Sequence, residues 1–229
     1  MNYILEGLRQ AVMLLVKWDP ETYAAIRATL TVTSYSMCAS LLLGIPAGFA
    51  LGYFDFRGKR VLRTMVDTCL AFPTVLIGLL VYAFLSRRGP LGSLNLLFSL
   101  SAIAIGQTIL ALPIIMSLTA TAVESLDRRL RLTLLSLGAR GHKLLFTTLW
   151  EARHALLIAA ITAYGRVLTE VGISMMVGGN IKWHTRTITT AIALETGKGN
   201  FGLGIALGIV LMLIALIVNL SVMSLRKKS

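Results

Sequence analysis

The stretch ESLDRRLRLTLLSLGARGHKLLFTTLWEAR, residues 124–153, separates two long apolar parts of the chain. It is polar and basic, with Arg128, Arg140 and Arg153 among its cations. Short basic loops of membrane proteins stay on the cytoplasmic side, and a connection of this length is usually functional. Its leucines recur at helical spacing on both sides of two glycines. The stretch therefore predicts two short amphipathic helices that meet at a glycine corner beneath a membrane.

The composition of the chain is that of an integral membrane protein. Of its 229 residues, 56% are hydrophobic and only 14% are charged, whereas a soluble domain has about 25% charged residues. The formal net charge of +12 lies beside apolar segments, so membrane topology and contacts with anionic lipids account for it. We therefore expect membrane lipids, and no nucleic acid, as partners.

Five uncharged or nearly uncharged segments have the length needed to cross a bilayer. Residues 1–20 precede them and form an amphipathic pattern that predicts a helix lying in the membrane interface. The remainder, residues 21–229, is predicted to be one all-α transmembrane domain. The five predicted spans are 28–54, 68–85, 95–122, 155–177 and 199–225.

The distribution of positive charge predicts the orientation. More than half of the 22 Lys and Arg residues fall in the segments 57–63, 128–153 and 226–228. Because Lys and Arg accumulate in cytoplasmic loops, these three segments are expected inside. The C-terminus is then cytoplasmic and, with five spans, the N-terminus is outside. The expected location is the inner (plasma) membrane.

Glycines in the first span and prolines in the next two indicate close helix packing and interrupted helices. Gly44, Gly48 and Gly52 are four residues apart, which lets another helix approach closely. That helix could belong to the same chain or to a partner chain. Pro73 and Pro113 fall in the next two predicted spans. Interrupted helices are tolerated where freed backbone groups line a cavity, which favours a transporter over a passive anchor.

Two charged residues fall within the predicted fourth span. Arg166 and Glu170 are four residues apart and share a helix face, so they can pair. An unpaired charge at the bilayer centre costs at least ~3 kcal/mol. The pair either fixes helix packing or forms part of a gate or translocation path, with Arg166 attracting an anion. Further candidate donors for such a path, which could equally bond helices together, are Thr74, Gln107, Thr108 and Thr169.

No arrangement of residues typical of an enzyme occurs in the sequence. His142, His154 and His184 lack the spacing of a metal pair, and no nucleophile elbow is found. Gly197-Lys198-Gly199 lacks the upstream glycine and the following Ser or Thr of a phosphate loop. We therefore expect no catalytic role, no metal and no cofactor. If ATP drives this protein, a partner must hydrolyse it.

Four stretches outside the polar loop carry a family resemblance. They resemble permease subunits of binding-protein-dependent ABC importers, in the molybdate/tungstate oxyanion branch, and are most similar to tungstate-type permeases. In the polar loop, the Ser-Leu-Gly-Ala around Gly138 is typical, while the family's Glu-Ala-Ala and Leu-Pro elements are replaced. The four stretches are AFPTVLIGLLVYAFLSRRGPLG (71–92), LPIIMSLTATAVESLD (112–127), TLWEARHALL (148–157) and GRVLTEVGISMMVGGNIKWHTRTITTAIALETGKGNFGLGIALG (165–208).

This resemblance implies a type I ABC importer bundle and a set of partners. The expected assembly is a homodimer of permease subunits, cytoplasmic ABC ATPase subunits and an extracytoplasmic oxyanion-binding protein. The loop 124–153 would dock into the ATPase as a coupling loop, with Leu137, Gly138, Ala139 and Arg140 at its tip. The expected function is tungstate import. Alternatives are a permease for molybdate or another oxyanion, a stand-alone channel or carrier, and a membrane enzyme.

Overall fold

The computed structural model describes residues 3–127, 134, 136 and 141–228, and every regular element in these ranges is helical. This confirms the predicted all-α membrane fold. Among the described residues the elements are α1 (Tyr3–Val16), α2 (Pro20–Tyr53), α3 (Lys59–Cys69), α4 (Thr74–Leu85), the 3-10 turn η1 (Gly92–Leu94), α5 (Leu100–Glu124), α7 (His142–Glu151), α8 (Arg153–Leu168), α9 (Gly172–Gly178), α10 (Ile188–Gly197) and α11 (Phe201–Lys228).

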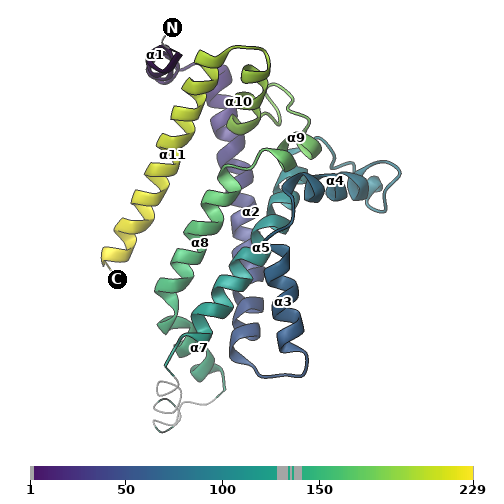
Figure 1. The fold of residues 1–229 in the computed structure, drawn as a ribbon, viewed down its shortest axis with the longest axis vertical. Coiled ribbons are helices and arrows are strands. Elements are labelled where there is room, and N and C mark those ends of the chain that lie inside the picture. Colours follow the sequence, from purple (N-terminus) through teal and green to yellow (C-terminus); the bar gives the residue numbers. More distant parts are fainter. Residues whose placement is uncertain (1–2, 128–133, 135, 137–140, 229) are drawn as a thin grey trace.

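The helices α2, α5, α8 and α11 run along the long axis of the molecule (Figure 1). Of the described helices, α2, α5 and α11 are each long and apolar enough to cross a bilayer, and counting two bent helix pairs as one span each gives up to five. The upper number equals the number of predicted spans. Large apolar side chains such as Leu42, Leu79 and Met212 are exposed on the outside of the bundle, as expected of surfaces that contact lipid or another membrane protein.

The glycines of α2 let this helix touch α5. A Cβ atom at Gly48 would lie 2.5 Å from the carbonyl oxygen of Met116, and one at Gly52 would lie 2.7 Å from that of Ala120. Any larger side chain at these positions would push the two backbones apart. Of the two interpretations of the glycine spacing, packing within the chain is therefore the one that the structure confirms.

The predicted second span is wrong as a single helix. Residues 68–85 contain only the end of α3 followed by α4, and these two helices meet at an angle of 98°. The segment 57–63, predicted as a basic turn, contributes Lys59 and Arg63 to the first turns of α3. Pro73 has no N–H to continue the α3 ladder and holds its neighbour away from helical geometry, so α4 begins anew at Thr74. With 12 residues, α4 is about 18 Å long, too short to cross the ~30 Å bilayer core.

The predicted fourth span is also interrupted. α8 ends at Leu168 and α9 begins at Gly172, so Glu170 lies in a break and not within a helix. α8 is itself preceded by α7, and these two helices meet at 63°. Arg166 remains helical, in the last turn of α8. The physical reason for this break is the set of bonds that Glu170 makes, described below.

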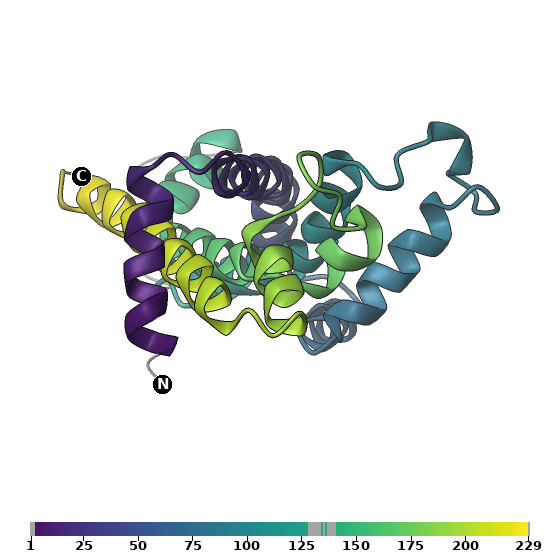
Figure 2. The same ribbon diagram turned by 90° about the horizontal axis from the view of Figure 1, so that it is seen from above.

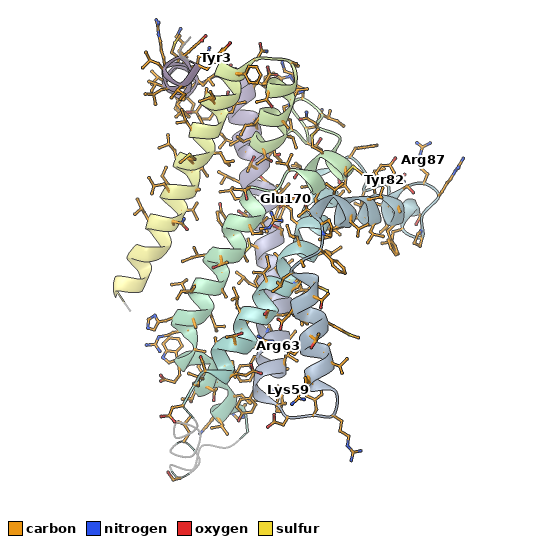
Figure 3. The ribbon with its side chains drawn as sticks, viewed as in Figure 1. Tyr3, Lys59, Arg63, Tyr82, Arg87 and Glu170 are labelled. Atoms are coloured by element: carbon orange, nitrogen blue, oxygen red, sulfur yellow. The ribbon has the colours of Figure 1, made fainter. Side chains whose placement is uncertain are left out.

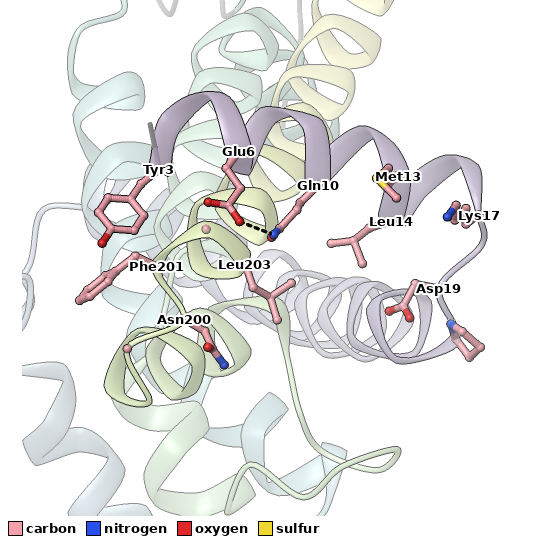
Figure 4. Close-up of a pocket in the computed structure, with 13 residues that line it drawn as sticks. Tyr3, Glu6, Gln10, Met13, Leu14, Lys17, Asp19, Asn200, Phe201 and Leu203 are labelled. Atoms are coloured by element: carbon pink, nitrogen blue, oxygen red, sulfur yellow. Dashed lines mark hydrogen bonds between the residues drawn. The ribbon is translucent and has the colours of Figure 1, made fainter. Parts of the chain in front are cut away.

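The N-terminal helix lies across the bundle. Figure 2 shows α1 crossing above α11, and α4 with its following loop projecting away from the rest of the molecule. Asp19 separates α1 from α2 by capping α2, because its carboxylate accepts a hydrogen bond of 2.8 Å from the Thr22 N–H. A groove of about 720 Å³ runs between α1 and the start of α11, lined by Glu6, Gln10 and Leu203 among others (Figure 4). An interfacial location for residues 1–20, and the division at residue 20, stay predictions.

The turn from α10 to α11 lies at the same end. The short helix α10 lies between α9 and α11. At its end, the Glu195 carboxylate binds the Lys198 ammonium at 2.7 Å and the Asn200 amide at 2.8 Å. The hydrogen bond from Lys198, and to a lesser extent that from Asn200, lowers the pKa of Glu195 below its usual value. They fix the direction in which α11 leaves α10.

Candidate functional site

The break between α8 and α9 is organised around the side chain of Glu170. This carboxylate is only 2% exposed, and Figure 3 shows it at mid-height in the bundle. Its Oε2 lies 3.3 Å from Nη1 of Arg166, and its Oε1 accepts a 3.1 Å hydrogen bond from the backbone N–H of Ile173. Glu170 therefore caps the start of α9 and pairs with the end of α8. We call Arg166, Glu170 and their contacts the helix-break junction.

A residue of a third helix, α10, also binds the junction. The buried Thr189 hydroxyl of α10 donates a 2.9 Å hydrogen bond to the backbone carbonyl of Glu170. In a continuous helix that carbonyl would accept from the N–H of residue 174. Thr189 thus gives the Glu170 carbonyl a donor in place of that helical bond. The break is thus satisfied by a residue that lies 19 positions further along the chain.

The beginning of α4 also reaches the junction. A Cβ atom at Gly172 would lie 3.1 Å from the Thr74 hydroxyl and 3.3 Å from Oε1 of Glu170. Only a glycine lets the start of α9 come this close to both groups. Of the residues predicted for a translocation path, Arg166, Glu170 and Thr74 are therefore brought together.

The charge at the junction is only partly neutralised. Charge-assisted hydrogen bonds are usually about 2.7–2.9 Å long, so the 3.3 Å separation of Arg166 and Glu170 is loose. The Arg166 side chain is 46% exposed, and the described residues use one of its five N–H donors. The arrangement can present the remaining donors to an oxyanion while Glu170 keeps the guanidinium in place. This geometry is compatible with both interpretations of the pair, helix packing and a translocation path, and the path stays a prediction.

Among the described residues, the other predicted path residues bond groups other than the side chains of Arg166 and Glu170. The buried Gln107 accepts a 3.2 Å hydrogen bond from Ser36, which joins α5 to α2. The hydroxyls of Thr108 and Thr169 each bond a carbonyl of their own helix, at 2.7 Å and 3.0 Å. Thr108 also lines a shallow hollow on the outer surface between α2 and α5. These contacts are those of polar residues that bond helices together or satisfy themselves locally.

Several buried hydroxyls escaped the sequence analysis. They lie on one face of α2, which contacts α10 at one end and α5 at the other: the Ile188 N–H bonds Thr29 at 2.9 Å, and Ser40 bonds the Thr108 carbonyl at 3.4 Å. Their helical spacing is the signal that could have found them. The hydroxyl of Thr33 has no hydrogen-bond partner among the described residues. The members of this face are Thr22, Thr29, Thr33, Ser36 and Ser40.

The predicted coupling tip lies outside the residues that the structure describes. This applies to Leu137, Gly138, Ala139 and Arg140. The second helix predicted in the loop 124–153 is α7, and it starts after Gly141, whose φ of +56° is a conformation that favours glycine. In the described part of the chain, no group of three His, Cys, Asp or Glu side chains is placed to hold a metal ion.

Comparisons with known proteins agree on one kind of protein. The family model described as "Binding-protein-dependent transport system inner membrane component" matches residues 44–228. The tungstate uptake system permease protein TupB of Campylobacter jejuni is 47% identical over 96% of this chain and 92% of its own length. TupB of Peptoclostridium acidaminophilum is 36% identical over the full length of both chains. The molybdenum transport system permease protein ModB of Escherichia coli K12 is 27% identical over 88% of this chain and 94% of its own length.

Proposed function

Because the chain belongs to the family of binding-protein-dependent transport system inner membrane components, we propose that it is the permease subunit of a tungstate importer. The observation that carries this proposal is the 47% identity to a tungstate uptake permease over 96% of the chain. A likeness of this extent includes the helix-break junction, the polar loop 124–153 and both interrupted spans. The substrate is then a tetrahedral oxyanion with two negative charges.

The helix-break junction is the part of this chain that suits such a substrate. The exposed donors of Arg166 attract the anion, and Thr74 adds a neutral hydroxyl nearby. Glu170 holds Arg166 and lowers the net positive charge of the site, so the anion binds weakly enough to leave again. Gln107 and Thr108 support the path indirectly, by their positions in the packing of α2 and α5.

Energy and substrate come from partners in this proposal. A cytoplasmic ABC ATPase hydrolyses ATP, and an extracytoplasmic oxyanion-binding protein delivers tungstate to the end where α1 lies. Two copies of the chain form a homodimer around the path, surrounded by membrane lipids. The N-terminus faces outward and the C-terminus faces the cytoplasm, as the basic segments predict. The permease itself performs no catalysis.

The loop 124–153 is the proposed contact with the ATPase. Leu137, Gly138, Ala139 and Arg140 form its tip, where glycine permits close approach and arginine pairs with acidic residues. Substituting Gly138→Asp is expected to abolish uptake and the co-purification of the ATPase, while the chain still inserts into the membrane. Normal uptake by this variant would contradict docking at the tip.

The function is tested by reconstitution into liposomes. The permease is combined with its ATPase and binding protein, and tungsten inside the vesicles is measured by mass spectrometry with ATP or a non-hydrolysable analogue. We expect accumulation against the gradient only with ATP. Uphill uptake by the permease alone would overturn the proposal in favour of a stand-alone carrier.

Molybdate is the second candidate substrate, supported by the 27% identity to a molybdenum transport permease. The two oxyanions have the same shape and charge, so they are compared in the same vesicles at equal concentration. A preference for tungstate supports the main proposal. Faster accumulation of molybdate, with a binding protein that holds both anions equally, would assign the permease to molybdate.

A further inference from the structure

A cluster of charged side chains joins three helix ends at the opposite end of the molecule from α1. We call it the inner clamp and define it as Lys59, Arg63, Asp67 and Glu124. Figure 3 shows Lys59 and Arg63 near the end of the bundle from which the polar loop starts. Glu124 is the last residue of α5 and the first residue of that loop. In the sequence, Lys59 and Arg63 belong to the basic segment 57–63, whose charge predicts only the orientation in the membrane.

The inner clamp connects α3 to α5 by direct contacts. The Lys59 ammonium lies 3.4 Å from Oε1 of Glu124, and Nη1 of Arg63 lies 3.9 Å from Oε2 of the same carboxylate. About one turn before Glu124 in α5, the Arg63 guanidinium donates a 2.6 Å hydrogen bond to the Thr121 hydroxyl. One turn earlier still in α5, the Ser117 hydroxyl donates a 2.6 Å hydrogen bond to the Asp67 carboxylate. Successive turns of the two helices are thus tied side by side.

The inner clamp also contacts the end of α2, and two of its members bond each other. The Lys59 ammonium donates a 3.1 Å hydrogen bond to the carbonyl of Gly52, and Nε of Arg63 lies 3.1 Å from the Asp67 carboxylate. Ion pairs of this exposure stabilise a fold by only about 0–1 kcal/mol each. Their value here is geometric, because several bonds to one guanidinium fix the position of one helix on another.

The far end of α3 leads to the helix-break junction. Turn bonds continue past Cys69, from the N–H of Ala71 to the carbonyl of Thr68 at 3.1 Å and from that of Phe72 to Cys69 at 3.3 Å. α4 then starts at Thr74 beside Gly172. A Cβ atom at Gly78 of α4 would lie 3.1 Å from Met176 of α9. These contacts form a continuous connection from α3 through α4 to α9, which begins next to Glu170.

We propose that Lys59 and Arg63 are positioning residues for transport, which fasten the start of the polar loop to α3. A movement imposed on the loop then reaches the Arg166–Glu170 pair through α3 and α4, two rigid elements that meet at a bend. This inference rests on the proposed function, because it needs an ATPase that moves the loop. It adds the residues by which that movement enters the membrane part of the chain.

The chain offers a matched pair of variants to test this role. Glu124→Gln and Asp55→Asn each remove one carboxylate charge from Lys59, since Asp55 lies 3.5 Å from the same ammonium. Asp55 is 95% exposed in its side chain and belongs to the connection between α2 and α3. Among the described residues, Glu124 is the ion-pair partner that links Lys59 to α5. The complex of permease, ATPase and binding protein in liposomes is assayed for ATP hydrolysis, for tungstate accumulated per ATP, and for melting temperature.

The expected result separates coupling from stability. Glu124→Gln lowers the tungstate accumulated per ATP by about 3- to 10-fold, the range typical of residues that modulate coupling, while the melting temperature and ATPase co-purification stay unchanged. Asp55→Asn behaves like the unaltered protein. Glu124→Asp, which keeps the charge, restores most of the ratio. A double change of Lys59→Gln with Glu124→Gln causes no further loss, because both single changes break the same link.

Three outcomes overturn the inference. One is an unchanged ratio of transport to hydrolysis in Glu124→Gln, and another is an equal effect of Asp55→Asn. A third is a fall in melting temperature that accounts for all lost uptake, which would leave the clamp a structural contact only. If the unaltered complex fails to accumulate tungstate with ATP, the proposed function falls first. That result is distinguishable because it occurs before any variant is compared.

Discussion

The two interrupted spans, α3–α4 and α8–α9, are broken in physically different ways. Between α3 and α4 the interruption is a local property of the chain, because Pro73 lacks an N–H and no side chain caps the start of α4. Between α8 and α9 no proline is present, and Glu170 makes the interruption through Arg166, Ile173 and the distant Thr189. The first break starts at a proline and is held by the contact of α4 with α9, and the second is made by a buried carboxylate whose partners lie on three helices.

This difference determines which break a single substitution can damage. The α8–α9 break depends on a buried carboxylate whose partners come from α8, α9 and α10, so each partner should matter. The α3–α4 bend depends on its proline and on the contact of α4 with α9. Four predictions test this contrast in detergent-solubilised protein, by the change in free energy of unfolding, and they are given in order of decreasing effect.

Arg166→Ala should have the largest effect. It leaves Glu170 buried without a cation, and breaking a buried pair in this way costs about 3 kcal/mol, the lower end of the usual range because Arg166 is half-exposed. Adding Glu170→Ala should recover part of the loss. Arg87→Ala, an exposed arginine, is the control. Strictly additive losses in the double variant would contradict the pair.

Gly78→Val should follow, at about 2 kcal/mol. The added side chain meets Met176 and the backbone of Ile173 and forces α4 away from α9. The matched control is Gly165→Ala, a helical glycine of α8 with open space around it. That control is expected to stabilise the protein slightly, by up to ~1 kcal/mol. Equal losses for both variants would mean that α4 is not held by α9.

Thr189→Val should cost about 1 kcal/mol. Valine keeps the shape of threonine but cannot donate to the Glu170 carbonyl, which is then left without its bond. Thr162→Val is the control, because its exposed hydroxyl bonds only its own helix. The amide of residue 174 should also exchange its hydrogen more slowly if it takes over the vacated carbonyl. No difference between the two variants would show that the break does not need α10.

Pro73→Ala should have the smallest effect, below about 1 kcal/mol. Alanine restores an N–H, yet α4 is still held by α9 through Gly78, so the bend persists. The measurement is the distance between spin labels placed on α3 and near Leu85. A large increase in that distance, as α3 and α4 align into one helix, would show that the proline alone maintains the 98° angle.

The parts of the fold that the sequence predicts correctly are those with local causes. Apolar length predicts α2, α5 and α11, the four-residue spacing of glycines predicts a close helix contact, and the spacing of Arg166 and Glu170 predicts their pairing. Each signal lies within one segment. The family resemblance adds the class of protein, which the match over residues 44–228 confirms.

The parts that sequence reasoning missed depend on distant partners. The span can be interrupted at Glu170 because the distant Thr189 hydroxyl donates a hydrogen bond to the Glu170 carbonyl, and no pattern around residue 170 reveals that partner. Lys59 looks like a topological charge until Glu124 is placed beside it. The sequence places Gln107 within a span, but the rotation of α5 against α2, which brings it to Ser36, is visible only in the structure. Local periodicity contains no information on such pairings.

The glycines of α2 have a mechanical consequence for the whole subunit. Backbones that are in direct contact at Gly48 and Gly52 cannot slip past each other by a turn without driving side chains of α5 into the axis of α2. We therefore expect α2 and α5 to move together as one rigid unit, without sliding along each other. We therefore expect deformation during a transport cycle to occur at the breaks between α3 and α4 and between α8 and α9.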